Sequence, residues 1–206
     1  MEDKNMKNTS LFIVLAMLLL ACSSSPTDKA TALIKEDMPK NLIKADSYDP
    51  VDTKVDSAFA PYDSPTFYTQ VMEYLKLESE MDACERKTRY AKSSMAIYSS
   101  PYDASSRNEY QEYKAEYEAC MEQQKSLEEK IREKVEYIKN AIQEKPKFIG
   151  FKAYHRFRSD NNAGQTLLGG ALYILNEDIT QILALYDVES EDYLKYQQFI
   201  KQLQEE

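Results

Sequence analysis

Two long stretches of the chain place an apolar or small residue at every third or fourth position. The first covers residues 71–98 and the second covers residues 110–142. This spacing gives each helix one side that can pack against a partner helix, as in a coiled coil. The segment between them, residues 99–106, contains Pro101 and several serines, which predicts a turn. We therefore expect an antiparallel helical hairpin over residues 66–145.

Apolar and polar residues alternate in the segments that flank this hairpin. Residues 51–59 alternate before it and residues 151–158 alternate after it, which is typical of half-buried β-strands. Residues 166–175 and 179–186 lie between polar turns and predict two more strands. Short helices are expected near residues 28–38 and after Ser190. The prediction is an α+β fold: a single domain over residues 29–206, with the hairpin inserted in an antiparallel sheet of about four strands.

Composition narrows the possible functions. The chain has 206 residues, of which 43% are hydrophobic and 30% charged, so it can bury a core. Acidic residues outnumber basic ones by 35 to 26, the net charge is −9, and no long basic run is present, which argues against nucleic-acid binding. Phosphate-loop, dinucleotide-binding and zinc-protease motifs are absent, so the sequence predicts no cofactor and no metal.

The N-terminal region carries the most specific motif in the chain. Lys7 precedes an apolar run from Leu11 to Ala21, which is too short to span a bilayer as a helix and has the size of a signal-peptide core. The run ends at Cys22, and three serines follow. This segment resembles the lipobox of bacterial lipoproteins. A buried helix that ends in an ordinary cysteine is the alternative.

The resemblance implies that residues 1–21 are a signal peptide, with translation starting at Met1 or at Met6. Cys22 would be acylated and would anchor the protein to a lipid bilayer, and residues 22–28 would form a polar tether. Several acyl chains on one cysteine give a stable anchor. Ser23 follows the cysteine, which in Gram-negative lipoproteins favours export to the outer membrane. The expected location is therefore the bacterial cell envelope.

Two cysteines remain in the exported body. Cys84 and Cys120 both lie on the helical seam, at equal distances from Tyr102 in the turn. The same register brings Leu77 near Leu127, and we expect a disulfide between the two cysteines, since exported proteins occupy an oxidising compartment. Two free buried thiols are the alternative. A metal site is disfavoured because the chain has one histidine and no CxxC motif.

One strand carries the candidate binding residues. Residues 151–158 would place several cationic or aromatic side chains on one sheet face: Lys152, Tyr154, Arg156 and Arg158. Such a strip could hold a carboxylate or phosphate group of a small ligand. The alternative is that these residues pair with acidic residues of the first strand, such as Asp52 and Asp56.

Other candidate residues carry weaker signals. His155 is the only possible histidine base for a hydrolase, but it is expected on the apolar face of its strand as a core residue. Glu78 and Asp82 belong to an acidic cluster that is expected to be a solvated helix face. Tyr98 and Tyr102, near the hairpin tip, are candidate contacts for a partner protein.

Two short segments of the body resemble parts of uncharacterised bacterial lipoproteins. These are residues 47–59, SYDPVDTKVDSAF, and residues 155–164, HRFRSDNNAG. The resemblance implies that the first strand pairs with the C-terminal sheet, and it implies no activity. The leading hypothesis is a non-enzymatic envelope lipoprotein that binds another envelope protein. A binder of small anionic ligands and a hydrolase are the alternatives.

Overall fold

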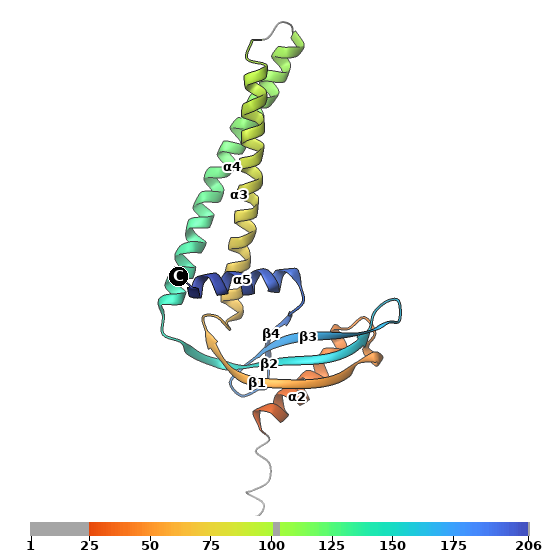
Figure 1. Ribbon diagram of the computed structural model, residues 1–206. Helices are drawn as coiled ribbons and strands as arrows, with labels where there is room; N and C mark the ends of the chain where they lie inside the picture. The colour runs from red at the N-terminus through yellow and green to blue at the C-terminus, as the bar shows by residue number, and fades with distance from the viewer. Residues whose placement is uncertain (1–24, 101–103, 206) are drawn as a thin grey trace, which may run out of the picture.

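The computed structural model describes residues 25–100 and 104–205. These residues form four α-helices and one antiparallel four-stranded sheet, which confirms the α+β class and the long helical hairpin (Figure 1). In chain order the elements are α2 (Pro26–Asp37), 3₁₀ turns at Met38–Asn41 and Ala45–Ser47, β1 (Asp49–Ala60), α3 (Pro65–Ile97), α4 (Ala104–Gln143), β2 (Lys147–Asp160), β3 (Thr166–Leu175), β4 (Ile182–Asp187) and α5 (Glu191–Glu205). None of the helices in the described ranges is long and apolar enough to cross a membrane.

The sheet has the strand order β1-β2-β3-β4, and every neighbouring pair is antiparallel. The pairing of β1 with β2 confirms that the first strand joins the C-terminal sheet, with the whole hairpin inserted between the two strands. Asp52 lies opposite Arg156, and His155 lies opposite Ala171. The hairpin therefore rises from one end of a continuous sheet.

Helix α2 covers one face of the sheet. Ala30 and Ile34 of α2 are fully buried, and they pack in one cluster with Ala153, Tyr173 and Leu175 of the central strands. The small side chain of Ala153 lets the helix approach the sheet closely. This cluster is the main hydrophobic core.

The base of the hairpin and α5 lie on the opposite face of the sheet (Figure 1). Phe67 of α3 and Ile138 of α4 are buried together with Tyr196 of α5. The ring of Tyr68 lies 4.4 Å from that of Tyr186 on β4, measured between centroids. Aromatic packing thus joins the hairpin to the sheet through α5 and β4.

The hairpin seam follows the expected register. Leu77 packs in one buried cluster with Leu127, Cys84 and Cys120. Phe67 and Ile138 share the cluster nearer the sheet. Antiparallel helices with apolar positions every third or fourth residue meet in this way. The buried seam residues therefore hold α3 and α4 together where the hairpin extends beyond the sheet.

Helix α2 begins earlier than expected, at Pro26, so residues 26–28 are helical and do not belong to the proposed tether of residues 22–28. The side chain of Ser25 accepts a hydrogen bond from the amide of Asp28, and the carboxylate of Asp28 accepts one from the amide of Ser25. Proline suits the first position of a helix because its missing N–H is not needed there.

Strand β4 begins at Ile182, three residues later than the expected start of the third C-terminal strand. The side-chain oxygen of Asn176 accepts hydrogen bonds from the amides of Thr180 and Gln181 at 2.8 and 2.9 Å. Ile179 adopts a positive φ of 55° within the same turn. These local bonds hold residues 176–181 in a turn, so they cannot extend the strand.

Candidate functional site

The cationic strip predicted on β2 lies on one face of the sheet, but its charges are paired. Arg156 forms two hydrogen bonds with the carboxylate of Asp52, at 2.6 and 3.0 Å. Arg158 bonds Asp49 at 3.1 Å. The alternative interpretation, pairing with acids of the first strand, describes this face better than an open anion site does.

Lys152 pairs with an acid outside the first strand, unlike the two arginines. Both carboxylate oxygens of Asp63, in the loop before α3, accept hydrogen bonds from Lys152 at 3.0 Å. Asp56 instead accepts a bond from the amide of Ser57. The lysine therefore ties the sheet to the start of the hairpin, a contact that strand periodicity alone could not indicate.

The pair of Asp52 and Arg156 also affects ionisation on this face. The hydrogen bond from Arg156 is the main cause that lowers the pKa of Asp52 below its usual range. Tyr154, which is partly exposed, lies over Gly170, where an added Cβ would come within 2.9 Å of the tyrosine hydroxyl. An anionic ligand would have to displace internal carboxylates to bind here.

His155 is fully buried, with 0% exposure, on the face that α2 covers. Its Nε2 lies 2.8 Å from the hydroxyl of Tyr48, and its Nδ1 lies 2.9 Å from the hydroxyl of Thr53. Its ring stacks on Phe157 at a centroid distance of 5.8 Å. Burial lowers the pKa of His155 below its usual value. The imidazole is thus a neutral core group with both nitrogens occupied, and a substrate could not reach it here.

The structure brings Cys84 and Cys120 together in the seam, where both are buried free thiols. The thiol of Cys84 donates a hydrogen bond to the carbonyl oxygen of Cys120 at 3.2 Å. Burial raises the pKa of the Cys84 thiol. The expected pairing thus has the two residues in contact as thiols, and the disulfide stays a prediction for the oxidised protein.

Tyr98, one of the two candidate partner contacts near the hairpin tip, is only partly available to a partner. Tyr98 is half-buried, and its ring stacks on that of Tyr113 at a centroid distance of 5.9 Å. Tyr90 lies edge-on to Tyr113 at the same distance but is 61% exposed. Tyr102 and the proposed acylation site, Cys22, lie outside the described residues.

Within residues 25–100 and 104–205, no group of three or more His, Cys, Asp or Glu side chains could hold a metal ion.

One concavity in the described part of the chain is a groove that the sequence did not indicate. Helix α5 crosses α3 near its base, where the ring of Phe199 lies 5.5 Å from that of Tyr74 (Figure 1). Beside this crossing the two helices enclose a groove of about 870 Å³. Its apolar lining comes from Met72 and Leu75 of α3 and from Phe199 of α5. We call this feature the α3–α5 groove.

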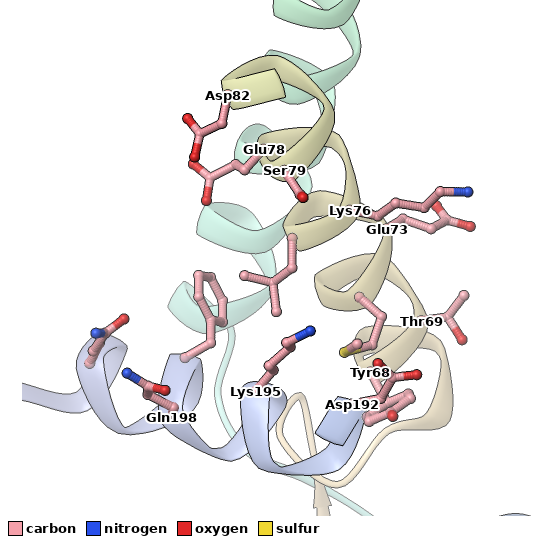
Figure 2. A pocket seen from close by; sticks show the side chains of 14 residues that line it. Tyr68, Thr69, Glu73, Lys76, Glu78, Ser79, Asp82, Asp192, Lys195 and Gln198 are labelled. Atoms are coloured by element: carbon pink, nitrogen blue, oxygen red, sulfur yellow. The ribbon is translucent and has the colours of Figure 1, made fainter. Parts of the chain in front are cut away.

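Charged side chains surround the apolar lining of the α3–α5 groove. Figure 2 shows Lys195 reaching into it from α5 and Glu78 and Asp82 on the α3 wall. Lys195 already pairs with Glu191 at 2.8 Å, and this hydrogen bond lowers the pKa of Glu191. Glu78 accepts a hydrogen bond from the hydroxyl of Tyr74.

The groove has an acidic balance. Its acidic lining residues are Glu73, Glu78, Asp82 and Asp192, of which Glu73 pairs with Lys134 of α4, and its basic ones are Lys76 and Lys195. Both lysines have carboxylate partners outside the groove lining, Glu80 and Glu191, although the pair of Lys76 is long, at 4.0 Å. An apolar side chain with neighbouring cationic groups would match this surface.

Sequence reasoning treated Glu78 and Asp82 as part of a solvated helix face. Both are exposed, so that interpretation is correct for α3 alone. The missing information was the position of α5, which turns this face into one wall of a groove. The last helix has apolar residues on one side between positions 193 and 203, which indicates that it packs against another element. This pattern does not indicate which element that is.

Comparison with known proteins does not assign the chain to a family. No protein-family model matches the chain, and no curated protein and no solved structure shows a significant similarity to it.

Proposed function

We propose that this protein is a lipid-anchored protein of the bacterial envelope that acts without catalysis, as a protein-interaction module. The proposed binding site is the α3–α5 groove. The proposed ligand is a segment of another envelope protein that carries an apolar side chain flanked by lysine or arginine.

The observation that carries this proposal is the composition of the groove. An apolar floor from Met72, Leu75 and Phe199 lies between walls with four acids and two lysines. Both lysines and one of the acids, Glu73, already have ion-pair partners, which leaves three acids without one among the residues that the structure describes. Recognition sites for protein segments combine an apolar centre with a polar rim in this way. Complementary charge would add association rate and specificity.

The position of α2 supports the proposed anchor. Ser25, which caps α2, is three residues after Cys22 in the sequence, so an acyl group on Cys22 would hold α2 within roughly 10 Å of the lipid headgroups. Helix α2 and the hairpin lie on opposite faces of the sheet (Figure 1). The groove would therefore face away from the membrane, toward other envelope proteins.

Site-specific photocrosslinking in cells tests the groove. A photoreactive amino acid at Ser79, which lines the groove, should capture one reproducible partner. Glu129 is the matched control because it is exposed on α4 and lies two residues beyond the buried Leu127, on the side turned away from the seam. Capture from neither position, or equal capture from both, would contradict the proposed site.

Charge reversal gives a second test. Asp82→Lys together with Asp192→Lys should abolish the crosslink from Ser79, because it gives the groove a cationic rim. Glu129→Lys, the control, should leave it unchanged. Loss of the crosslink in both variants would show that general charge, and not the groove, governs the contact.

The distal hairpin is a second candidate surface. Ile97 is 76% exposed, and Tyr90 is 61% exposed on the same helix. A photoreactive group at Lys92 would report on it. Capture from Lys92 without capture from Ser79 would transfer the proposed binding site from the groove to the hairpin tip.

The anchor is tested separately, by metabolic labelling with a radioactive fatty acid. We expect the label in the full-length protein and its loss in Cys22→Ala. Unlabelled wild-type protein would overturn the anchor without bearing on the groove.

A further inference from the structure

The outer edge of β1 is the longest unpaired strand edge in the described part of the chain. Strand β1 covers Asp49–Ala60, and β2 is the only strand that pairs with it, because β1 is the first strand in the sheet order. It lies at the free edge of the sheet in Figure 1. Such an edge presents a row of N–H and C=O groups that can pair with another strand.

Two hydrogen bonds reveal which backbone groups face outward. The amide of Ser57 donates to Oδ1 of Asp56 at 2.7 Å, and the amide of Phe59 donates to Oδ2 of Asp63 at 2.8 Å. These amides are therefore turned away from β2. Since backbone direction alternates along a strand, Thr53 and Val55 present their N–H and C=O groups at the same outer edge.

The side chains along this edge carry unpaired opposite charges. Lys54 and Asp56 are both exposed, and neither forms an ion pair within residues 25–100 and 104–205. Asp52, by contrast, is already held by Arg156. Near the two ends of β1, Val51 and Phe59 are 39% and 43% exposed.

We propose that two copies of this chain form a dimer by antiparallel pairing of their β1 edges about a two-fold axis at Val55. In this register Lys54 lies opposite Asp56 of the second copy, and the symmetry repeats the pair. Thr53 lies opposite Ser57, and Val51 comes toward Phe59. Both charges that lack an ion pair and both exposed apolar residues of the edge thus find complementary partners.

The pairing also replaces the local hydrogen bond between the amide of Ser57 and the carboxylate of Asp56. The amide of Ser57 would donate to the carbonyl of Thr53 in the second copy, which frees the carboxylate of Asp56 for Lys54. The bond between Phe59 and Asp63 lies beyond this core of five residues, 53–57, and can stay. The dimer therefore requires only one existing hydrogen bond to change partner.

Other registers are less favourable. An axis at Lys54 or at Asp56 places that residue opposite its own copy, which brings like charges together. Centring the axis at Thr53 places Lys54 opposite Asp52, whose carboxylate is already bound by Arg156, and places Asp56 opposite Pro50. Centring it at Ser57 places Asp56 opposite Ala58 and Lys54 opposite Ala60. Only the axis at Val55 joins the two charges that lack an ion pair.

The symmetry is compatible with a common membrane. Antiparallel edge strands are related by an axis perpendicular to the sheet, so both α2 helices lie on one side of the joined sheet and both hairpins on the other. Two copies anchored in one bilayer need this arrangement. The dimer itself rests on β1 and does not depend on the anchor or on the α3–α5 groove.

Charge-swap variants test both the dimer and its register. The mass of the full chain in detergent micelles is measured by sedimentation velocity over a range of protein concentrations. Lys54→Asp and Asp56→Lys should each weaken the dimer by roughly tenfold or more, because each creates two like-charge contacts. The double variant, Lys54→Asp with Asp56→Lys, should restore dimerisation. Glu177→Lys, an exposed change in the β3–β4 turn, is the control and should change nothing.

Each outcome decides the proposal. A monomeric wild-type protein at all concentrations, or a dimer that is insensitive to both single changes, overturns it. Failure of the double variant to restore a dimer overturns the register at Val55, provided that its circular dichroism spectrum matches that of the wild type. Restoration by the double swap supports both the interface and the register.

Discussion

Mild acid should destabilise the protein through one buried side chain. His155 is the only histidine of the chain and has 0% exposure. Its two ring nitrogens are engaged by the hydroxyls of Tyr48 and Thr53. Burial is the largest cause of its lowered pKa; the nearby Asp52 acts in the opposite direction, and Lys35 adds to the lowering. The folded state therefore binds a proton at this site less readily than the unfolded chain does.

The sign and size of the effect follow from linkage. The unfolded histidine has a pKa near 6.5, and the folded pKa is lower. Between these values the unfolded chain carries more protons, so the free energy of unfolding falls as the pH falls below 6.5 and is fully retained above it. One proton gives a slope of up to about 1.4 kcal/mol per pH unit. Asp52 and Glu191, whose pKa values are lowered from 3.8 and 4.5, lose their contributions only at more acid pH.

Urea unfolding between pH 5.0 and 7.5 measures this slope. His155→Gln is the comparison because it keeps a polar side chain at the site but cannot titrate. The variant should be less stable at neutral pH by about 1–3 kcal/mol, since it cannot match both hydroxyls, and its stability should depend less on pH. Equal slopes in the two proteins, or no slope in the wild type, would refute the reasoning.

Three other predictions concern the packing of the fold. Oxidation should join Cys84 to Cys120 and raise the free energy of unfolding by about 4 kcal/mol in the chain-entropy model. The oxidised protein should migrate faster on a non-reducing gel, and two titratable thiols after oxidation would contradict this prediction. Gly150→Ala should cost at least about 2 kcal/mol in chemical denaturation, because φ is 133° and an added Cβ would lie 2.1 Å from the carbonyl oxygen of Leu175. Tyr196→Phe should cost about 1–2 kcal/mol, because its hydroxyl donates a 2.7 Å bond to a backbone carbonyl before α3; an unchanged melting temperature would contradict that role.

Local periodicity predicted most of the fold because each element has one buried side. The seam residues of α3 and α4 repeat every third or fourth position, and Leu77 meets Leu127 as this register requires. Alternation located the strands, and it placed His155 on the buried face. The start of β4 was predicted incorrectly because bonds from the Asn176 side chain, rather than hydrophobic pattern, determine where that strand begins.

The candidate sites were less predictable because they depend on contacts between distant segments. The strip on β2 could be found from the sequence, and so could the alternative of ion pairing, but the choice between them required the register that sets Asp52 beside Arg156. Likewise, the acidic face of α3 was visible, yet nothing in its sequence indicated that α5 crosses it.

The crossing of α5 over α3 explains why a groove persists in a molecule this small. The rings of Tyr74 and Phe199, and of Tyr68 and Tyr196, hold the two helices together at centroid distances of 5.5 and 4.8 Å. Two helices that cross cannot stay in contact along their lengths, so a gap opens between them beside the crossing. The lysines on the diverging walls pair with Glu80 and Glu191 of their own helices and do not close the gap. A segment that supplied an apolar side chain there would gain contacts without rearranging the helices, which is why the groove is a better candidate for binding than the neutralised strip on β2.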